Sequence, residues 1–233
     1  FFSFFFIVLL AACGPSAERQ AVVLQGKTMG TTYTVKYLSD DQDKLPSPAE
    51  IQKRIDDALK EVNRQMSTYQ TDSEISQFNQ LRTVNQAMPI SQDFAYVTGE
   101  ALRLNKLTHG ALDVTVGPLV NLWGFGPQKE ITHEPTAQEI QHASEMVGTD
   151  KLKLSQDGQR PTLAKTHPEV YLDLSSIAKG FGVDKTAAEL EKLNIGNYLV
   201  EIGGELHGKG HNAQGNPWRI GIEQPNIVQG GAT

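Results

Sequence analysis

The sequence has 233 residues, of which 39% are hydrophobic and 21% charged, a balance typical of a globular protein rather than a disordered or fibrous one. Its formal net charge of −6 argues against nucleic acid as a partner, because nucleic-acid binders normally present a basic face. The single cysteine excludes an intrachain disulfide framework and any zinc or iron–sulfur site built from several cysteines.

The first twelve residues form an apolar, uncharged run that is too short to span a bilayer but has the length of a signal-peptide core. The run ends in the sequence LAAC, which resembles a bacterial lipobox whose cysteine, Cys13, becomes lipid-modified. The alternative is a core strand that ends in a buried thiol. We expect a lipoprotein signal peptide, clipped at its start, over 1–12, a lipidated cysteine and flexible tether over 13–20, and one domain over 21–233. This arrangement predicts a periplasmic protein held to the membrane, the inner membrane being favoured, by its lipid anchor.

Hydrophobic periodicity predicts two strands and three helices in the first two thirds of the domain. Strands are predicted at 22–24 and 31–38, the second because aromatic and β-branched residues alternate with polar ones. Capping boxes or N-cap serines begin helices at 47–66, 91–110 and 136–147.

The last third mixes short β-type runs with one long helix. Strands are predicted at 151–154, 170–174, 198–202 and 218–222, and the helix at 176–193. Because the elements do not alternate as regular βαβ units, the predicted fold class is α+β rather than a doubly wound parallel sheet. No repeat, low-complexity tract or linker divides the domain.

The segment DLSSIAKGFG at 173–182 combines an acid, two hydroxyls and a cation around a predicted helix start. Asp173 ends an apolar run, and Lys179 lies one helical turn inside, so a phosphate is one predicted ligand. The same oxygen atoms suit a hydrated Mg²⁺. The alternative is a serine-capped helix whose glycines let it pack closely on a sheet.

Four other segments contain residues that suit either a ligand contact or a purely structural role. Asp113 lies inside an apolar run, so either a backbone turn or a nucleotide amine or hydroxyl must satisfy it. Tyr69 lies in a polar loop where it is available for stacking, and the aromatic residues at 122–126 either line a pocket or belong to the core. The paired glycines within 200–206 suit a close approach to a ligand or a bulge. The six histidines have no metal-ligand spacing, and no G-x-S-x-G nucleophile motif occurs.

Taken together and in order, five segments closely resemble the ApbE family of flavin transferases, which transfer FMN from FAD to proteins. The segments are TMGT at 28–31, MSTY at 66–69, GALDVTVGPLV at 110–120, DLSSIAKG at 173–180 and VEIGGE at 200–205. The resemblance implies an α+β fold with mixed or antiparallel sheets and packed helices. It also implies that FAD, as substrate, is contacted by Met29, Tyr69, Ala111, Leu112, Asp113, Asp173 and Lys179, and that Ser176 is a ligand of Mg²⁺.

The reaction implied by the resemblance cleaves the FAD pyrophosphate, releases AMP and leaves FMN on a threonine of a partner protein. Expected acceptors are subunits of the sodium-pumping NADH:quinone oxidoreductase or of Rnf-type complexes. The family's C-terminal motifs, which include a histidine and the remaining metal ligands, have no counterpart before Thr233, so we expect the catalytic residues beyond it and an impaired fragment. The alternatives are an FAD-binding lipoprotein without turnover and an Mg²⁺-dependent FAD pyrophosphatase that releases FMN and AMP.

Overall fold

A computed structural model describes residues 21–38, 45–127, 133–156 and 160–222. The expected signal peptide, Cys13 and the tether therefore lie outside the described residues. None of the helices within the described ranges is long and apolar enough to cross a membrane.

Two antiparallel sheets form the β-structure of the domain. The larger has the strand order β1 (Val22–Thr28), β2 (Thr31–Leu38), β6 (Asn197–Ile202) and β7 (Glu205–Lys209). The smaller has the order β3 (Met88–Pro89), β5 (Thr162–Lys165) and β4 (Leu152–Ser155). The helices are α1 (Pro48–Met66), α2 (Glu74–Gln80), α3 (Gln92–Leu107), α4 (Gly117–Leu122), α5 (Ala137–Glu145) and α6 (Ser175–Lys192), with a 3₁₀ turn at Thr149–Lys151. Helices packed with antiparallel sheets confirm the predicted α+β class.

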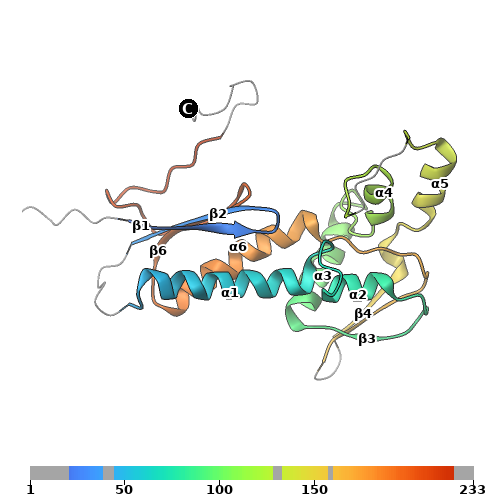
Figure 1. Ribbon diagram of the computed structural model, residues 1–233, viewed down its shortest axis with the longest axis horizontal. Coiled ribbons are helices and arrows are strands. Elements are labelled where there is room, and N and C mark those ends of the chain that lie inside the picture. The colour runs from blue at the N-terminus through green and yellow to red at the C-terminus, as the bar shows by residue number, and fades with distance from the viewer. Residues whose placement is uncertain (1–20, 39–44, 128–132, 157–159, 223–233) are drawn as a thin grey trace, which may run out of the picture.

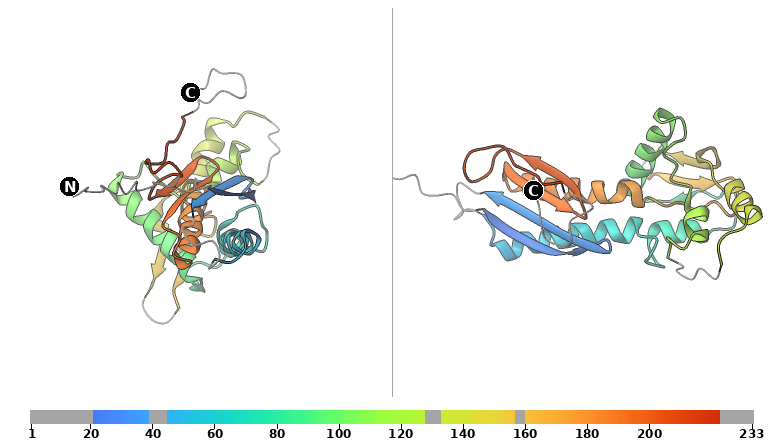
Figure 2. Two further views of the ribbon diagram at one scale, coloured as in Figure 1. Left: turned by 90° about the vertical axis from the view of Figure 1, so that its left-hand side faces the viewer. Right: turned by 90° about the horizontal axis from the view of Figure 1, so that it is seen from above.

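The two sheets lie at opposite ends of an elongated molecule, and α1 and α6 run side by side between them (Figure 1). The view from above separates the ends in the same way (Figure 2). We call the four-stranded sheet with the helix halves that cover it the four-stranded lobe. The three-stranded sheet with α2, α3, α4 and α5 is the three-stranded lobe.

Each lobe has its own hydrophobic core, and both long helices contribute to both cores. The core of the four-stranded lobe takes Ile51, Ile55 and Leu59 from α1 and Val183, Ala187 and Leu190 from α6. The core of the three-stranded lobe takes Val62 and Met66 from α1 and Ala178 from α6. The structure therefore confirms the apolar stripe predicted along each helix. One part of each stripe packs in the core of the four-stranded lobe and the other part in the core of the three-stranded lobe.

Most predicted elements form, but two predicted strands do not. Residues 170–174 make only an isolated parallel bridge, between Tyr171 and Val116, because side chains and a neighbouring loop take up their backbone groups. Residues 218–222 are mostly exposed and extend without pairing to any strand in the described part of the chain. Five short elements, α2, α4, β3, β5 and β7, were not predicted, since they are too short for periodicity to reveal.

Candidate functional site

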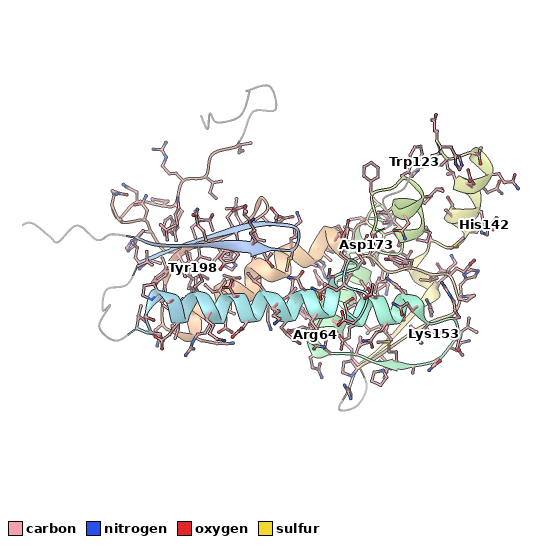
Figure 3. All side chains as sticks on the ribbon, in the orientation of Figure 1. Arg64, Trp123, His142, Lys153, Asp173 and Tyr198 are labelled. Atoms are coloured by element: carbon pink, nitrogen blue, oxygen red, sulfur yellow. The ribbon has the colours of Figure 1, made fainter. Side chains whose placement is uncertain are left out.

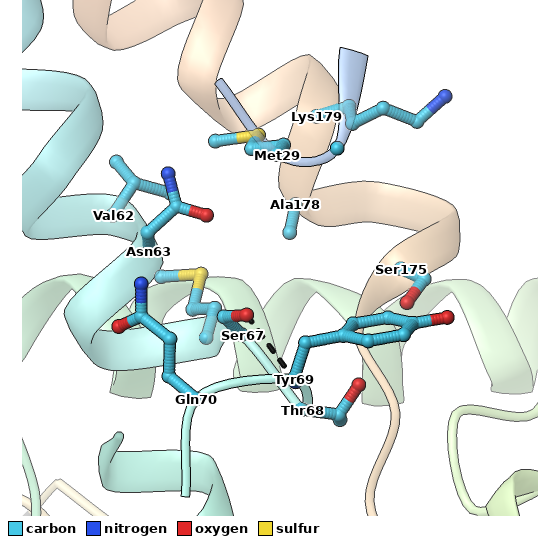
Figure 4. A pocket seen from close by; sticks show the side chains of 12 residues that line it. Met29, Val62, Asn63, Ser67, Thr68, Tyr69, Gln70, Ser175, Ala178 and Lys179 are labelled. Carbon is cyan, nitrogen blue, oxygen red and sulfur yellow. Dashed lines mark hydrogen bonds between the residues drawn. The ribbon is translucent and has the colours of Figure 1, made fainter. Parts of the chain in front are cut away.

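A cavity of about 680 Å³ opens where the two lobes meet (Figure 4). The β1–β2 turn, the end of α1, the loop after it and the first turns of α6 form its walls. Its lining residues are Met29, Gly30, Val62, Asn63, Met66, Ser67, Thr68, Tyr69, Gln70, Ser175, Ala178 and Lys179. Three predicted site residues, Met29, Tyr69 and Lys179, come from distant parts of the sequence and meet here.

Met29 reaches the cavity from a two-residue hairpin turn between β1 and β2. Met29 and Gly30 have φ angles of 49° and 73°, the left-handed conformation that such turns require. This conformation is unfavourable for methionine, so the turn alone does not explain why a methionine occupies this position. Its side chain packs against both cores and lies on Gly182 of α6, where an added Cβ atom would approach the Met29 Cε atom to 2.7 Å.

Tyr69 presents an exposed aromatic ring at the cavity, with 59% of its surface accessible. Its hydroxyl donates a hydrogen bond to the Phe125 carbonyl at 3.2 Å, and its backbone N–H donates to the Ser67 hydroxyl at 3.3 Å. Figure 4 shows the ring extending across the cavity from the loop after α1. Trp123 and Phe125 are exposed, so they do not belong to the core. They are not lining residues of the cavity either.

Asp173 and the two serines lie at the start of α6, close to the junction of the lobes (Figure 3). The Asp173 Oδ1 atom accepts a hydrogen bond from the Ser175 N–H at 2.8 Å. The helix begins at Ser175, one residue earlier than predicted. Its N-cap residue is Leu174, and no side-chain hydrogen bond from this residue caps the helix. The interpretation as a serine-capped helix is therefore wrong. Ser175 and Ser176 are exposed, and Ser175 lines the cavity.

The loop that carries Asp113 lies directly beside Asp173. The Asp173 N–H donates to the Val114 carbonyl at 2.8 Å, which joins two predicted segments about 60 residues apart in sequence. The Asp113 Oδ1 atom accepts from the N–H and the hydroxyl of Thr115, so a backbone turn satisfies one oxygen of this carboxylate. Ala111 is exposed and Leu112 half-buried on the same loop, and neither lines the cavity.

Two buried polar residues that the sequence did not reveal hold the segment before α6. The Asn79 side chain binds both backbone groups of Leu172: its Nδ2 donates to the carbonyl at 2.9 Å, and its Oδ1 accepts from the N–H at 2.8 Å. The Lys165 ammonium donates to the Val170 carbonyl at 3.0 Å and to the Asn79 carbonyl at 3.2 Å. These bonds replace a strand partner and fix the approach to Asp173.

Lys165 is 1% exposed, and no ion pair links it to a carboxylate in the described part of the chain. Burial, together with the nearby positive charge of Arg82, lowers the pKa of Lys165 to about 8. The Phe78 ring lies 5.2 Å from the ammonium and provides a cation–π contact. Nothing in the sequence around Lys165 distinguishes it from an ordinary exposed lysine at the end of a short strand.

Asn63 is a further cavity residue that was not predicted. Its Nδ2 atom donates to the Thr28 hydroxyl at 3.0 Å and to the Leu59 carbonyl at 2.9 Å, so it ties α1 to the end of β1. The signal was present in the sequence, since this polar residue continues the apolar stripe of its helix.

The chemistry of the donors near α6 fits a magnesium ion better than a transition metal. Within the described ranges, no group of three His, Cys, Asp or Glu residues is arranged to hold a metal. The cavity end of α6 instead offers the oxygen atoms of Asp173, Ser175 and Ser176. Mg²⁺ prefers oxygen ligands and commonly takes few from the protein, with water and substrate phosphates completing its shell.

Comparison with known sequences gives a consistent result. The model of the ApbE family matches residues 29–233. An FAD:protein FMN transferase of Haemophilus influenzae is 54% identical over 219 residues, which is 94% of this chain and 62% of that protein. An FAD:protein FMN transferase of Vibrio cholerae is 49% identical over 223 residues, covering 96% of this chain and 64% of that protein. The chain thus spans less than two thirds of the length of these relatives.

Solved structures show the same similarity. The flavin transferase ApbE from Vibrio cholerae superposes with a TM-score of 0.82 at 49% identity, covering 89% of this chain and 65% of that one. The apo form of the flavinyl transferase ApbE from Pseudomonas stutzeri gives a TM-score of 0.79 at 35% identity, covering 88% of this chain and 66% of that one.

Proposed function

This chain belongs to the ApbE family, and we propose that it forms the FAD-binding part of an enzyme that transfers FMN from FAD to a protein. The observation that carries the proposal is the cavity in which Met29, Tyr69 and Lys179 meet. Its volume lies within the range of about 300–1,000 Å³ that is usual for small-molecule sites. An aromatic ring face and an apolar side chain suit a flavin ring, and a cation suits a pyrophosphate.

We propose the following roles for this chain's residues. The ring of Tyr69 offers a face for stacking on the flat part of the ligand, and Met29 packs against it. Lys179 binds a phosphate oxygen as a charged hydrogen-bond donor. The second oxygen of Asp113, and the carboxylate of Asp173, accept hydrogen bonds from ligand hydroxyl or amino groups, with Ala111 and Leu112 giving the loop its contact surface.

In the proposed reaction the hydroxyl oxygen of an acceptor threonine attacks the FMN-side phosphorus of FAD. The new bond is a phosphoester between FMN and threonine, the bond to the AMP phosphate breaks, and AMP leaves with the electron pair. The threonine hydroxyl proton is released to solvent, so FAD and threonine give FMN-threonine, AMP and one proton. The described part of the chain would lower the barrier of this reaction mainly by positioning the substrate in the cavity.

We propose that Mg²⁺ takes part, with Ser176 as one of its ligands. When bound, it would withdraw negative charge from the pyrophosphate. The support is the set of oxygen donors at the start of α6, where Ser175 and Ser176 are exposed.

The site proposal is tested by titrating the chain with FAD and following the flavin fluorescence. We expect Lys179→Met to weaken FAD binding about tenfold, because a charge-assisted hydrogen bond is lost. Glu191→Gln, which changes a residue of the same helix away from the cavity, should leave the affinity unchanged. Unchanged FAD affinity in the Lys179 variant would refute the assignment of this site.

The transfer proposal is tested on the full-length protein with FAD, Mg²⁺ and a threonine-bearing acceptor. An acceptor mass increased by one FMN, with release of AMP, supports the transferase. Free FMN with AMP would instead indicate an FAD pyrophosphatase, and binding without either product an FAD-binding lipoprotein. We propose subunits of the sodium-pumping NADH:quinone oxidoreductase or of Rnf-type complexes as acceptors, and each is tested in the same assay.

We also propose that the protein is periplasmic and attached to the inner membrane through lipidated Cys13. The support is the LAAC sequence that follows an apolar run. Replacing Cys13 with serine should release the protein from the membrane fraction, whereas unchanged fractionation would refute the lipid anchor.

A further inference from the structure

Lys179 lines the cavity, and its ammonium forms an ion pair with Glu205, a residue that does not line it. The Lys179 Nζ atom lies 2.7 Å from the Glu205 Oε1 atom, and about a third of each side chain is exposed. In Figure 4 the side chains of Lys179 and Tyr69 are well separated and do not point toward one another. Glu205 itself lines a second hollow of about 570 Å³ rather than the cavity, so the two sites share this ion pair.

The backbone fixes the position of Glu205. It is the first residue of β7 and follows a two-residue turn, Gly203–Gly204, with φ angles of 54° and 98°. The Gly203 N–H donates to the Thr32 carbonyl at 3.2 Å, and the Gly204 N–H donates to the Glu201 carboxylate at 2.6 Å. The paired glycines therefore make a tight hairpin turn, not a bulge, and this turn delivers the carboxylate to Lys179.

The carboxylate of Glu205 is only partly satisfied by this ion pair. Its Oε2 atom is buried, and no donor among the described residues binds it. A buried carboxylate oxygen without a hydrogen bond destabilises a fold, so stability alone does not explain a glutamate at this position.

Resting on the proposed FAD site, we propose that Glu205 is a specificity-determining residue that competes with phosphate groups for Lys179. A phosphate in the cavity must share the ammonium with this carboxylate or take it over. A small anion such as inorganic phosphate has few contacts in the cavity besides Lys179, so the competition from Glu205 weakens its binding strongly. A flavin nucleotide has further contacts at Tyr69 and Met29, so it binds in spite of the competition.

The test compares FAD with riboflavin, which lacks phosphate, in titrations followed by flavin fluorescence in the presence of EDTA to prevent turnover. Glu205→Gln removes the charge, and Glu205→Ala removes the charge and the hydrogen-bond acceptor. We expect both variants to bind FAD about two- to fivefold more tightly, the range that an ion pair of this exposure supplies. Riboflavin affinity should not change, and inorganic phosphate should become a better competitor of FAD.

Glu191→Gln is a matched control, because Glu191 forms a similar ion pair between α6 and β7, with Lys209 at 2.6 Å, away from the cavity. It removes the same charge and should leave FAD affinity unchanged. Equal tightening in this control, or no tightening in either Glu205 variant, would overturn the inference. If Lys179→Met also leaves FAD affinity unchanged, the proposed FAD site fails as well. If Lys179→Met weakens FAD binding, only the role of Glu205 fails.

Discussion

The two lobes are stabilised in different ways. In the four-stranded lobe, continuous antiparallel ladders pair β1 with β2, β2 with β6 and β6 with β7, so backbone groups satisfy one another. In the three-stranded lobe the strands are short, and buried side chains such as Asn79 and Lys165 bind the backbone where strands are missing. The segment that places Asp173 before the start of α6 thus depends on individual polar side chains rather than on a sheet. Asp173 does not itself line the cavity.

The largest expected effect is from Asn79→Ala, which removes the side chain bound to both backbone groups of Leu172. The variant leaves a buried N–H and a buried C=O without partners, so the free energy of unfolding should fall by about 2–4 kcal/mol. FAD affinity should fall too, because Asp173 is no longer held in place. Urea unfolding and FAD titration measure the two effects.

Two controls test whether this effect belongs to the three-stranded lobe. Gln77→Ala removes an exposed side chain of the same helix and should change stability by less than about 0.5 kcal/mol. Tyr33→Phe removes a partly buried hydroxyl, bound to Asp56 at 2.7 Å, from the four-stranded lobe and should cost only about 0.5–1.5 kcal/mol. A loss in Tyr33→Phe as large as that in Asn79→Ala would remove the proposed difference between the lobes.

A smaller effect is expected from Lys165→Met as a function of pH. The folded protein lowers the pKa of Lys165 from 10.5 to about 8, so between these values the unfolded chain binds a proton that the folded protein has released. The contribution of Lys165 to the free energy of unfolding therefore rises as pH increases from about 8 to 10.5, and is flat below pH 8.

Urea unfolding at a series of pH values measures this contribution. We expect the stability difference between the wild type and Lys165→Met to increase in favour of the wild type across that interval, by up to about 1.4 kcal/mol per pH unit. The raised pKa of Tyr33, about 12, acts in the opposite direction at higher pH but is present in both proteins. Parallel stability curves would show that Lys165 is not held in a low-dielectric site.

The smallest effect is expected from Gly182→Ala, at the boundary between the lobes. The added methyl group meets the flexible end of Met29, so stability should change by no more than about 1 kcal/mol. Displacing Met29 should weaken FAD binding by about two- to fivefold, or roughly 0.4–1 kcal/mol. Gly180→Ala is the matched control, since nothing lies within 4 Å of its added Cβ atom. Equal FAD affinities in the two variants would contradict the role of Met29.

The sequence predicted the four-stranded lobe better than the three-stranded lobe for a physical reason. The strand at 31–38 and the helix ending at Met66 agree with the structure, because alternation and helical periodicity report burial directly. The segment 170–174 has the composition of a strand but receives its hydrogen bonds from Asn79 and from the Val114 loop. Such long-range partners leave no periodic signal.

The candidate site was predicted in part. Met29 was identified through the resemblance, and Tyr69 and Lys179 from their local sequence as well; all three line the same cavity. Glu205 acquires its role only through a tertiary contact. The assignment of Asp113 needed the structure, since its local sequence fits both a backbone turn and a ligand contact. One carboxylate oxygen makes the turn with Thr115, and the contact of the other oxygen with a ligand stays a prediction.

The continuous passage of α1 and α6 through both cores limits how this molecule can move. Many enzymes close two rigid bodies around a ligand by a hinge in the connecting segments. Here the connections between the lobes include two unbroken helices packed along their length, so bending at the cavity would disrupt both cores at once. Heating should therefore unfold both lobes in a single transition. Adaptation to a ligand is left to side chains on a rigid frame, above all to the swing of one lysine away from its carboxylate.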